Sequence, residues 1–559
     1  MESENNEDRK VVPDSTPEPA AAPRPRDFPS ILRRSSQILF LAIFLFLFIL
    51  TDYRGKDEIS LAVNAFFRLN PLVLATYVLS AKAFTLLLLP AALVLGASML
   101  LGRFFCGWVC PLGTLVDATT GRIRKHWSPR FIEGNARYYL LFTLLFAALF
   151  NVNLAGLLDP IAILVRFLTF LFYPLLGQGI REGWAGLYHL IGDKRDYLEG
   201  AYRLLRDYVL PFRQTFYPLA FLSLLVFSAV FSLELFGRRT WCRYLCPLGT
   251  LLSLAARLSP LKRMPARLCG DCAGDCRRTC AASFSDDNLA QEDCVRCLSC
   301  LSSCPKGRPR FRLTSLGSPF RRPFSRERRV LMGGLASGFL LSRLFSFGTW
   351  SGIFLRPPGA FNEPVLQKKC VRCGECMKVC PRNALYPAGM STGLYNLYTP
   401  VLIPRLGYCE YNCNLCGQVC PTGAIPHLPV DEKQKAVIGT AVLDRNLCLP
   451  YANKTPCLVC EEHCPIPNKA IKLEPYRETT AEGQWLVLER PLVDESLCNG
   501  CGICVQRCQF GAIKFEVTME KTNIDQMKCF GCGLCETACP RKAISLLDRM
   551  SLPGLREVW

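Results

Sequence analysis

Long apolar runs alternate with short basic segments over the N-terminal half of the chain. About 20 apolar residues cross the hydrocarbon core of a membrane as a helix, and four runs approach or exceed this length. We expect these helices at about 37–52, 71–101, 138–158 and 212–236. The hydropathy pattern therefore predicts a four-helix membrane domain over residues 37–260.

The segment 161–211, between the third and fourth predicted helices, has a mixed pattern. Its first part is apolar, and its second part mixes charges of both signs with Trp184 and Tyr188. An interfacial helix and a re-entrant hairpin both fit this composition, so both alternatives stay open.

Basic residues predict the orientation of these helices. They occur before the first helix, in GRIRKH at 121–126, and at Arg238 and Arg239, all on one side of the predicted bundle. Short loops rich in Lys and Arg remain in the cytoplasm. We therefore expect a multi-pass protein of the inner (cytoplasmic) membrane. Its residues 1–36, which begin with a Pro-, Glu- and Ala-rich stretch, would form a disordered cytoplasmic tail.

A further apolar stretch begins near residue 330, after the basic run RRPFSRERR. We expect a fifth, linking transmembrane helix within residues 321–354, which would place residues 355–559 outside the cytoplasm. Arg343 interrupts the stretch. The alternative is a helix on the membrane surface that leaves the C-terminal half inside.

An internal repeat joins the apolar and cysteine patterns. FFCGWVCPLGTLVD at 104–117 recurs as TWCRYLCPLGTLLS at 240–253, which predicts a pseudo-twofold arrangement about the membrane normal. Three roles are open for its cysteines: a shared metal or cluster site, a redox-active thiol pair, or packing at helix ends. The cysteines concerned are Cys106, Cys110, Cys242 and Cys246.

Cysteine dominates the composition, with 32 of 559 residues. Outside the repeat, the cysteines form seven quartets of closely spaced residues. Four quartets have the spacing C-x2-C-x2-C-x3-C, and Gln509 replaces the proline that follows the other three. These are Cys294, Cys297, Cys300 and Cys304; Cys370, Cys373, Cys376 and Cys380; Cys498, Cys501, Cys504 and Cys508; and Cys529, Cys532, Cys535 and Cys539. The variant quartets are Cys269, Cys272, Cys276 and Cys280; Cys409, Cys413, Cys416 and Cys420; and Cys448, Cys457, Cys460 and Cys464.

This spacing is typical of 4Fe–4S ligands. Three thiolates on one tight loop bind three irons, and the fourth cysteine often reaches the neighbouring cluster. A zinc site would pair two C-x2-C units, and disulfides would join distant segments. We expect about seven clusters, and an eighth if the repeat cysteines share one. The fold class is then an α-helical membrane bundle, four helices plus a fifth linking helix, joined to α+β bacterial-ferredoxin-like 4Fe–4S domains.

The quartets divide between two predicted domains. Residues 261–320 would form a cytoplasmic two-cluster ferredoxin, in which Cys304 joins the loop of Cys269 and Cys280 joins the loop of Cys294. Residues 355–559 would form an extracytoplasmic polyferredoxin. Its five quartets are an odd number, so pairwise exchange cannot account for all of them and the pairing stays open.

Other chemistries find little support. The net charge of +20 lies largely beside the apolar runs, and no groove-reading motif accompanies it, so we expect no nucleic-acid partner. There is no C-x-x-C-H motif for c-type haem, and no phosphate-binding glycine motif. The four histidines are scattered. The chain therefore reads as a membrane-bound carrier of single electrons.

Two stretches resemble known families. The N-terminal half resembles NapH-type membrane ferredoxins, through CGWVCPLG, CRYLCPLGT and the two following quartets. NosR-type proteins share that core, but their flavin-bearing domain has no counterpart here. Residues 326–515 resemble the NapG/MauM-type polyferredoxins, through RRVLMGG, LRPPGAFNE, CVRCGECMKVCP, the variant quartet at Cys448, and CNGCGICVQRC. The chain thus looks like a fusion of the two, with an additional quartet at Cys529–Cys539.

The resemblance implies a quinol dehydrogenase component. Quinol from the membrane pool would be oxidised, and electrons would pass to an extracytoplasmic reductase or cytochrome within a membrane redox complex. No residue is identified as the partner of the quinone, and neither the terminal acceptor nor the direction of electron flow follows from the ligands. Two alternatives remain: a relay from a cytoplasmic donor without quinone, and a maturation factor that reduces a metal or thiol site in another enzyme.

Arg328, Arg329, Val330 and Leu331 resemble the twin-arginine export signal of NapG-like proteins, placed internally. The alternative is that these arginines only follow the positive-inside rule. Both interpretations place the C-terminal half outside the cytoplasm.

Overall fold

The structure is a computed structural model of the chain. It describes residues 28–120, 136–191, 195–211, 215–264, 293–302, 310–313, 325–347, 354–360, 362–403, 406–436, 438, 449–452, 455, 457, 461, 471–479 and 485–493.

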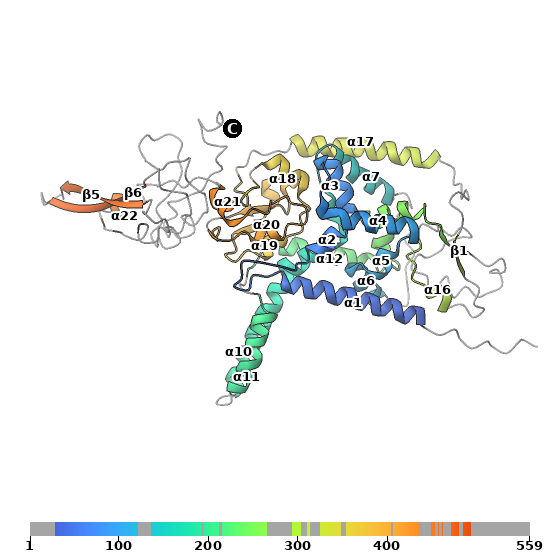
Figure 1. Ribbon diagram of the computed structural model, residues 1–559, viewed down its shortest axis with the longest axis horizontal. Helices are drawn as coiled ribbons and strands as arrows, with labels where there is room; N and C mark the ends of the chain where they lie inside the picture. The colour runs from blue at the N-terminus through green and yellow to red at the C-terminus, as the bar shows by residue number, and fades with distance from the viewer. Residues whose placement is uncertain are drawn as a thin grey trace, which may run out of the picture.

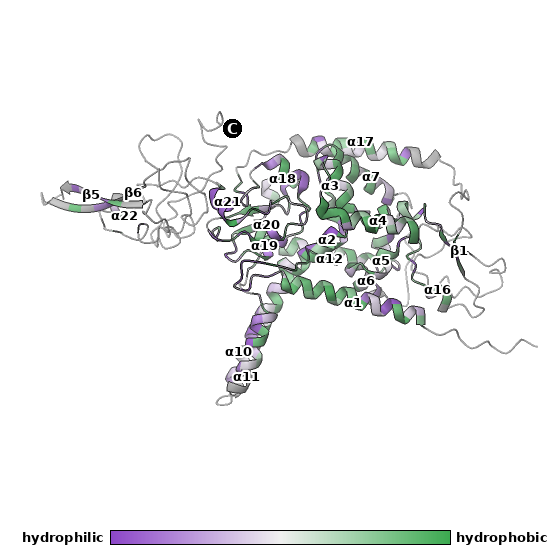
Figure 2. Cartoon of the chain, viewed as in Figure 1, coloured by the Kyte–Doolittle hydropathy of each residue, from purple (hydrophilic) through white to green (hydrophobic). Residues whose placement is uncertain are grey.

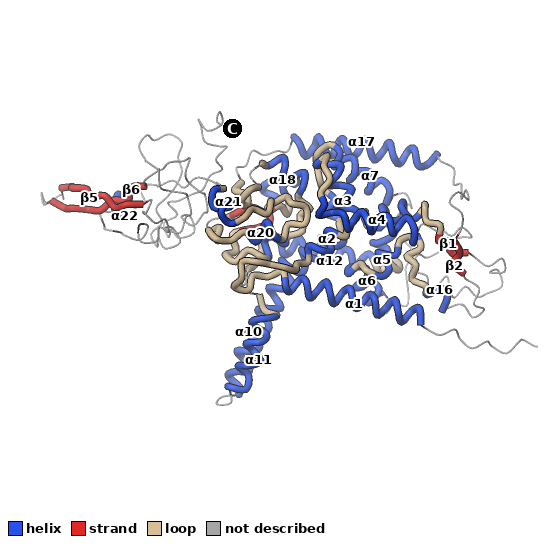
Figure 3. The backbone as a smooth tube through the Cα atoms, in the orientation of Figure 1, coloured by secondary structure: helices blue, strands red, loops and turns tan. Residues whose placement is uncertain are grey.

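Helices form most of the described chain (Figure 3). Up to residue 256 they are α1 (Phe28–Leu50), α2 (Asn64–Arg68), α3 (Pro71–Ala81), η1 (Leu86–Leu88), α4 (Leu89–Leu101), α5 (Phe104–Trp108), α6 (Pro111–Thr120), α7 (Ala136–Leu149), α8 (Ala155–Leu158), α9 (Pro160–Phe167), the π-helical η2 (Leu168–Phe172), α10 (Tyr173–Ile191), α11 (Arg195–Tyr208), α12 (Ala220–Leu233), α13 (Thr240–Tyr244) and α14 (Pro247–Ala256). Beyond it they are α16 (Ser299–Ser302), α17 (Ser325–Phe347), α18 (Glu363–Lys369), α19 (Glu375–Lys378), η6 (Met390–Thr392), η7 (Leu394–Asn396), α20 (Leu415–Gln418), α21 (Val430–Lys435) and α22 (Leu449–Ala452).

The strands form three small antiparallel pairs. β1 (Leu261–Met264) pairs with β2 (Arg310–Leu313), β3 (Leu385–Pro387) with β4 (Pro400–Leu402), and β5 (Ile471–Thr479) with β6 (Trp485–Val493). β1 and β2 flank the quartet at Cys294, and β3 and β4 lie between the quartets at Cys370 and Cys409. Helices and short strand pairs therefore surround the cysteine loops, as ferredoxin-like domains require.

The helical bundle is apolar and elongated (Figures 1 and 2). Its long helices α1 and α17 run along opposite sides, with α4, α7 and α12 among the helices between them (Figure 1). One continuous core joins α1, α3, α6, α9 and α14 around Phe44, Leu72, Leu112 and Leu164. The described cysteine loops at Cys294 and Cys370 lie at the two ends of this bundle (Figure 1).

The first helix begins earlier than predicted. The expected disordered tail 1–36 is wrong over residues 28–36, because α1 already begins at Phe28. Arg33 Nε donates to the carbonyl of Gly107 at 3.2 Å, and Ser36 Oγ donates to the carbonyl of Trp108 at 3.2 Å. These contacts with α5 stabilise the polar first turns of a helix whose hydropathy alone would place its start near residue 37.

The predicted helix 71–101 is two helices. Asn70 caps the start of α3, and Lys82, with φ 52°, ends it in the left-handed conformation. Thr85 then starts η1 by accepting a hydrogen bond from the backbone N–H of Leu87. A left-handed residue stops a helix irrespective of the hydropathy of its neighbours, so a hydropathy window does not detect the break.

The segment 161–211 does not match either predicted alternative by itself. Its first part, α9, is buried in the bundle, and the helix continues through η2 into α10. α10 then leaves the bundle, and α11 returns beside it as a helical hairpin (Figure 1). Among the described helices, Phe28–Leu50 and Pro160–His189 are long and apolar enough to cross a membrane. α7 and α12, at the predicted third and fourth crossings, have 14 residues each, so four full crossings are not confirmed.

Candidate iron–sulfur sites

Two loops of identical sequence, C-V-R-C, lie at the two ends of the bundle. Each presses its backbone against a glycine of the bundle. A Cβ on Gly107 would lie 2.3 Å from the carbonyl oxygen of Val295, and one on Gly156 would lie 1.9 Å from that of Val371. Real Cβ contacts are never this short. At each end of the bundle, the backbone of one cysteine loop therefore packs directly on a glycine of the bundle.

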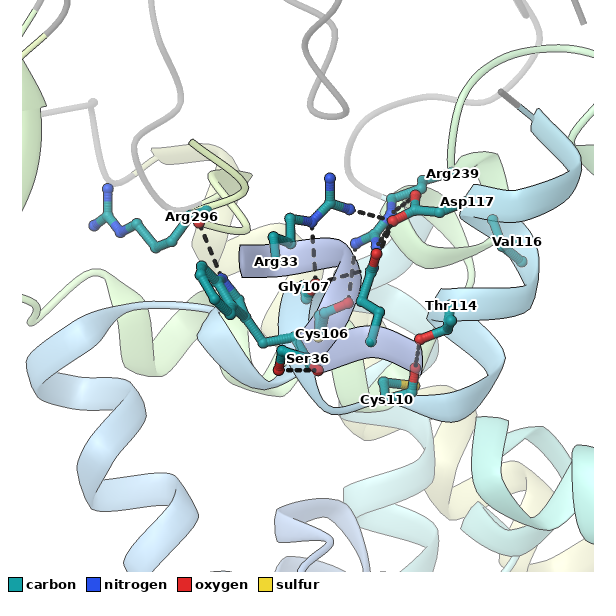
Figure 4. Close-up of polar contacts among 12 residues, drawn as sticks. Arg33, Ser36, Cys106, Gly107, Cys110, Thr114, Val116, Asp117, Arg239 and Arg296 are labelled. Atoms are coloured by element: carbon teal, nitrogen blue, oxygen red, sulfur yellow. Dashed lines mark hydrogen bonds and ion pairs between the residues drawn. The ribbon is translucent and has the colours of Figure 1, made fainter. Parts of the chain in front are cut away.

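The arginine of each C-V-R-C loop ties it to the bundle or to its own domain. Both arginines have positive φ, 52° at Arg296 and 54° at Arg372, and both are buried. Arg296 Nε donates to the carbonyl of Leu101 at 3.2 Å, and the carbonyl of Arg296 accepts from Trp108 Nε1 at 3.1 Å (Figure 4). At the other end, the carbonyl of Arg372 accepts from Arg166 Nη1 at 3.4 Å. Both loops thus dock through their backbone carbonyls as well as through their side chains.

Thiols from two different quartets line one hollow. Three of them belong to the Cys370 loop and the fourth, Cys420, ends the next quartet. Backbone N–H groups of Arg372 and Ile425 point at the Sγ atoms of Cys370 and Cys420, each at 3.4 Å. Such donors stabilise thiolates bound to iron. The residues that would hold the cluster are Cys370, Cys373, Cys376 and Cys420.

The remaining cysteines of these two quartets form a complementary set. Burial raises the pKa of the Cys416 thiol, and the nearby thiols of Cys409, Cys413 and Cys380 raise it further. The backbone N–H of Ala384 donates to the Sγ of Cys380 at 3.3 Å. The fourth cysteine of each quartet thus lies with the first three of the other, an arrangement that exchanged ligands would fit and that the spacing alone left open. The second set is Cys380, Cys409, Cys413 and Cys416.

The fit to a cluster rather than a single ion is also geometric. Among the described residues, no three or more His, Cys, Asp or Glu side chains lie close enough to bind one metal ion. Zinc would require four ligands about 2.3 Å from a single centre. A cubane instead spreads its four thiolates over four irons.

The repeat cysteines also converge. Burial raises the pKa of the Cys246 thiol, and the charges of Cys242, Cys106 and Cys110 act on it in the same direction. Burial likewise raises the pKa of Cys110 to about 12. Two short helices of the repeat, α5 and α13, carry the first cysteines, and the prolines after the second cysteines start α6 and α14. The structure thus brings together all four thiols of the predicted shared site.

Two buried arginines cross between the repeats. Arg239, just before the second repeat, donates through Nη1 to the carbonyl of Cys106 at 3.0 Å. Arg103, just before the first repeat, donates through Nη2 to the carbonyl of Cys242 at 3.2 Å. Both are 1% exposed, which leaves each guanidinium dependent on protein partners. Each repeat therefore positions the first cysteine of the other.

Each crossing arginine also pairs with an acid. Arg239 binds both carboxylate oxygens of Asp117 at 2.7 Å, and Arg33 pairs with the same carboxylate (Figure 4). Burial would raise the pKa of Asp117, but the charges of Arg239 and Arg33 outweigh it and hold this pKa at about 2. Asp117 therefore stays ionised at neutral pH, as its two arginine partners require.

The second repeat has Ser253 where the first has Asp117, so the acid that pairs with Arg103 comes from another segment of the chain. Asp293, next to the Cys294 quartet, pairs with Arg103 at 3.3 Å and accepts from Ser253 Oγ at 3.3 Å. Arg137 of α7 pairs with it as well. The cysteine loop at Cys294 is thus linked electrostatically to the repeat cysteines through Arg103.

Sequence reasoning missed the roles of these charged residues. Arg239 served only as a marker of orientation, and Arg103, Asp117 and Asp293 were not singled out. The signal was present, because an arginine occurs three residues before the first cysteine in both repeats.

Several predicted ligands lie outside the described residues. These are Cys269, Cys272, Cys276, Cys280, Cys304, Cys448, Cys460, Cys464, Cys498, Cys501, Cys504, Cys508, Cys529, Cys532, Cys535 and Cys539. Cys457 is described and is half-buried, and Cys294, Cys297 and Cys300 are described without Cys304. The predicted exchange within residues 261–320 therefore stays a prediction.

Comparison with known protein families agrees with these sites. Residues 83–130 and 219–265, which contain the two repeats, each match a 4Fe-4S binding domain. Residues 364–386 match another 4Fe-4S binding domain, and residues 497–543 match a 4Fe-4S dicluster domain.

Relatives with curated names are ferredoxin-type proteins. NapG of Escherichia coli is 37% identical over 191 residues, which is 34% of this chain and 80% of NapG. The chain belongs to the NapG/MauM ferredoxin-type family. The methylamine utilization protein MauM of Methylophilus methylotrophus is 39% identical over 28% of this chain and 66% of MauM. No solved structure matches the chain.

A third relative matches over a longer stretch of the chain. YccM of Escherichia coli, named for electron transport, is 25% identical over 291 residues, 50% of this chain and 69% of YccM. The chain is an iron–sulfur electron-transfer protein, and its fusion of a NapG/MauM part with a NapH-type part is compatible with these matches.

The exchange between the quartets predicts which cluster each cysteine serves. Replacing Cys420 by Ser should remove the cluster of the Cys370 loop, because a weaker serine ligand replaces a thiolate of that site. Replacing Cys413 by Ser should spare that cluster and remove its neighbour. Electron paramagnetic resonance (EPR) of the reduced variants should then show the loss of two different signals. If both variants lose the same signal, the exchanged pairing is wrong.

Proposed function

We propose that this chain is a membrane-bound electron-transfer subunit that oxidises quinol and passes electrons to an extracytoplasmic reductase or cytochrome. The observation that carries the proposal is the placement of cysteine loops at both ends of one apolar bundle, with the repeat cysteines beside one of them. A protein that moves electrons across or along a membrane needs carriers at both faces.

The exposed surface of α1 supports a membrane position. This helix has 23 residues, so it is about 35 Å long, and its outer face exposes Ile38, Leu39 and Phe46. Exposure of such an apolar face to water is unfavourable, whereas lipid chains would cover it. Residues 37–260 would form the membrane domain, and α17 within 321–354 would be the linking helix. Residues 261–320 would lie in the cytoplasm, with 355–559 outside.

The cysteines define what each part would hold. The quartets would bind 4Fe–4S clusters, which accept and donate one electron at a time. The chain's own residues bury the thiols, direct backbone N–H groups at Sγ atoms, and place the loops against the bundle. At the repeat, we favour an eighth cluster over a redox-active thiol pair. Reactive cysteines have lowered pKa values, and burial here raises those of Cys110 and Cys246.

A relay without quinone is the second candidate function. The contact of the Cys294 loop with α5, and the pairing of Asp293 with Arg103, favour it, because they connect a cytoplasmic-side loop directly to the repeat cysteines. In that case a low-potential cytoplasmic donor would supply the electrons.

One experiment separates these functions. The full-length protein, purified anaerobically in detergent, is mixed with a menaquinol or ubiquinol analogue while absorbance and EPR report cluster reduction, with iron content measured in parallel. We expect reduction by quinol, and iron near four atoms per cluster. Clusters that stay oxidised with quinol, but are reduced by a low-potential ferredoxin, would overturn quinol oxidation and establish the relay.

A further inference from the structure

A hollow that opens to solvent lies where the bundle meets the second cysteine set. The loop after α1, the π-helical η2 with the start of α10, and the segment after α19 all contribute to its wall. Its chemically active lining residues are Asp52, Thr169, Tyr173, Tyr217, Lys378 and Cys380. Cys380 is also one of the proposed cluster ligands, so the hollow reaches an electron carrier directly.

Thr169 points to a missing ligand in this hollow. It is 2% exposed, yet its Oγ1 has no hydrogen-bond partner among the described residues. Two other buried helical threonines donate to the carbonyl four residues earlier, Thr76 to Leu72 at 3.0 Å and Thr250 to Cys246 at 3.0 Å. A buried unpaired hydroxyl is costly, and single π-helical turns occur frequently at functional sites.

A carboxylate faces the same space. The Tyr173 hydroxyl donates to Asp52 Oδ2 at 2.9 Å, which orients the carboxylate. An ionised carboxylate has about four acceptor positions, so Asp52 can also accept a hydrogen bond from a ligand hydroxyl. Asp52 lies two residues beyond the end of α1, at the end of a candidate membrane span.

Lys378 joins the bundle to the cysteine loop beside the hollow. Its Nζ donates to the carbonyls of Phe48 at 2.6 Å and Thr51 at 2.7 Å, at the end of α1. It also lies over the rings of Phe48 and Tyr173, 4.4 and 4.8 Å from their centroids. Asp52 lies near enough for its charge to act on Lys378, and the contacts of Lys378 keep the α1 end next to Cys380.

Exposed apolar side chains flank the lining residues. Phe172 is 47% exposed and Leu175 is 51% exposed, on either side of Tyr173 and Pro174, and Phe216, at 60%, precedes Tyr217. A molecule with a polar ring and a long apolar tail fits this arrangement. Its ring would bind the polar residues inside the hollow, and its tail would contact the exposed apolar side chains outside.

We propose that this hollow is the quinol-binding site, in which Thr169 and Asp52 pair with the quinol hydroxyls beside Cys380. The inference rests on the proposed quinol oxidation and names its site. Oxidation to quinone breaks two O–H bonds and releases two electrons and two protons. The oxidant would be a cluster held by Cys380, Cys409, Cys413 and Cys416, which would supply a one-electron acceptor beside the hollow for each of the two electrons in turn. Asp52 accepts the first proton and passes it to water, and the second follows the same route.

The test measures binding as well as reduction. The intact full-length protein, with its clusters, is titrated with a fluorescent hydroxyquinoline N-oxide, a quinol analogue whose fluorescence is quenched on binding. The variants are Asp52→Asn, Thr169→Val, and the control Asp57→Asn, which alters an exposed acid of the same loop. Loss of one hydrogen bond should weaken binding about tenfold in each of the first two variants. Thr169→Val should leave the melting temperature unchanged, because it removes no hydrogen bond within the protein.

Each outcome decides the inference. Weaker binding and slower reduction by quinol in the two site variants, with wild-type binding in Asp57→Asn and full reduction by dithionite in all, would support it. Site variants that bind the analogue as the wild type does would overturn the site and leave quinol oxidation standing. A wild-type protein that neither binds the analogue nor is reduced by quinol would overturn the proposed function, and this inference with it.

Discussion

Replacing Arg239 by Met is expected to remove iron from the repeat cysteines and to destabilise the bundle. Arg239 is fully buried, binds both oxygens of Asp117 and holds the carbonyl of Cys106. Without it, the Asp117 carboxylate faces a cavity with only Arg33 and Gln37 as partners. Removing one partner of a buried ion pair costs about 3–5 kcal/mol. Iron content should fall by about four atoms per chain, the content of one cluster.

The control for this prediction is Arg238→Met. It removes the neighbouring positive charge and leaves the contacts of Arg239 with Asp117 and Cys106 in place. Arg103→Met should reproduce the loss of iron, because Arg103 holds Cys242 as Arg239 holds Cys106. Thermal unfolding and iron content of the purified variants check both expectations. If the Arg239→Met protein keeps the full iron content, the repeat cysteines do not hold a cluster that depends on the contacts of Arg239.

Replacing Gly156 by Ala is expected to separate the Cys370 loop from the bundle. The added Cβ would lie 1.9 Å from the carbonyl oxygen and 2.6 Å from the carbonyl carbon of Val371. Both are backbone atoms of a loop whose cysteines would be fixed by a cluster, so the loop must move as a unit. Overpacking of this kind costs about 1–3 kcal/mol. The melting temperature and the rate of electron arrival at the cluster of the Cys370 loop should both fall.

Gly179→Ala is the matched control, because a Cβ at Gly179 in α10 meets nothing within 4 Å. Alanine should be neutral or slightly stabilising there, since it lowers the entropy of the unfolded chain. Stopped-flow absorbance after mixing with quinol, together with thermal unfolding, compares the two variants. If Gly156→Ala behaves like Gly179→Ala, the contact of Gly156 with Val371 does not position the loop.

The two ends of the bundle hold their cysteine loops by the same two kinds of contact. Short backbone-to-backbone contacts fix a cysteine loop at each end of the bundle, at Gly107 and at Gly156. Charged side chains then connect the loops to the bundle, Asp293 with Arg103 at one end and Lys378 with the end of α1 at the other. Electron transfer depends steeply on separation, so these rigid contacts are where substitutions should affect it most.

The sequence alone determined the chemistry of the chain. Three ligands of a 4Fe–4S cluster lie on one loop, so spacings such as that of Cys370, Cys373 and Cys376 identify them without any knowledge of the fold. The repeat likewise raised a shared site of Cys106, Cys110, Cys242 and Cys246 as one of three alternatives, because two copies of one motif tend to pack symmetrically. The NapG/MauM relationship was also readable from local motifs and is confirmed.

Only the tertiary structure decided the contacts between distant segments. Cys420 joins the Cys370 loop across some fifty residues, and no local spacing specifies that partner. Arg239 was only a marker of orientation and Arg103 was not singled out, but the fold buries both against carbonyls of the opposite repeat. Lys82 divides a predicted crossing because a single residue with positive φ outweighs an apolar window. Spacing and hydropathy report local requirements, whereas pairing across the chain depends on which surfaces become buried together.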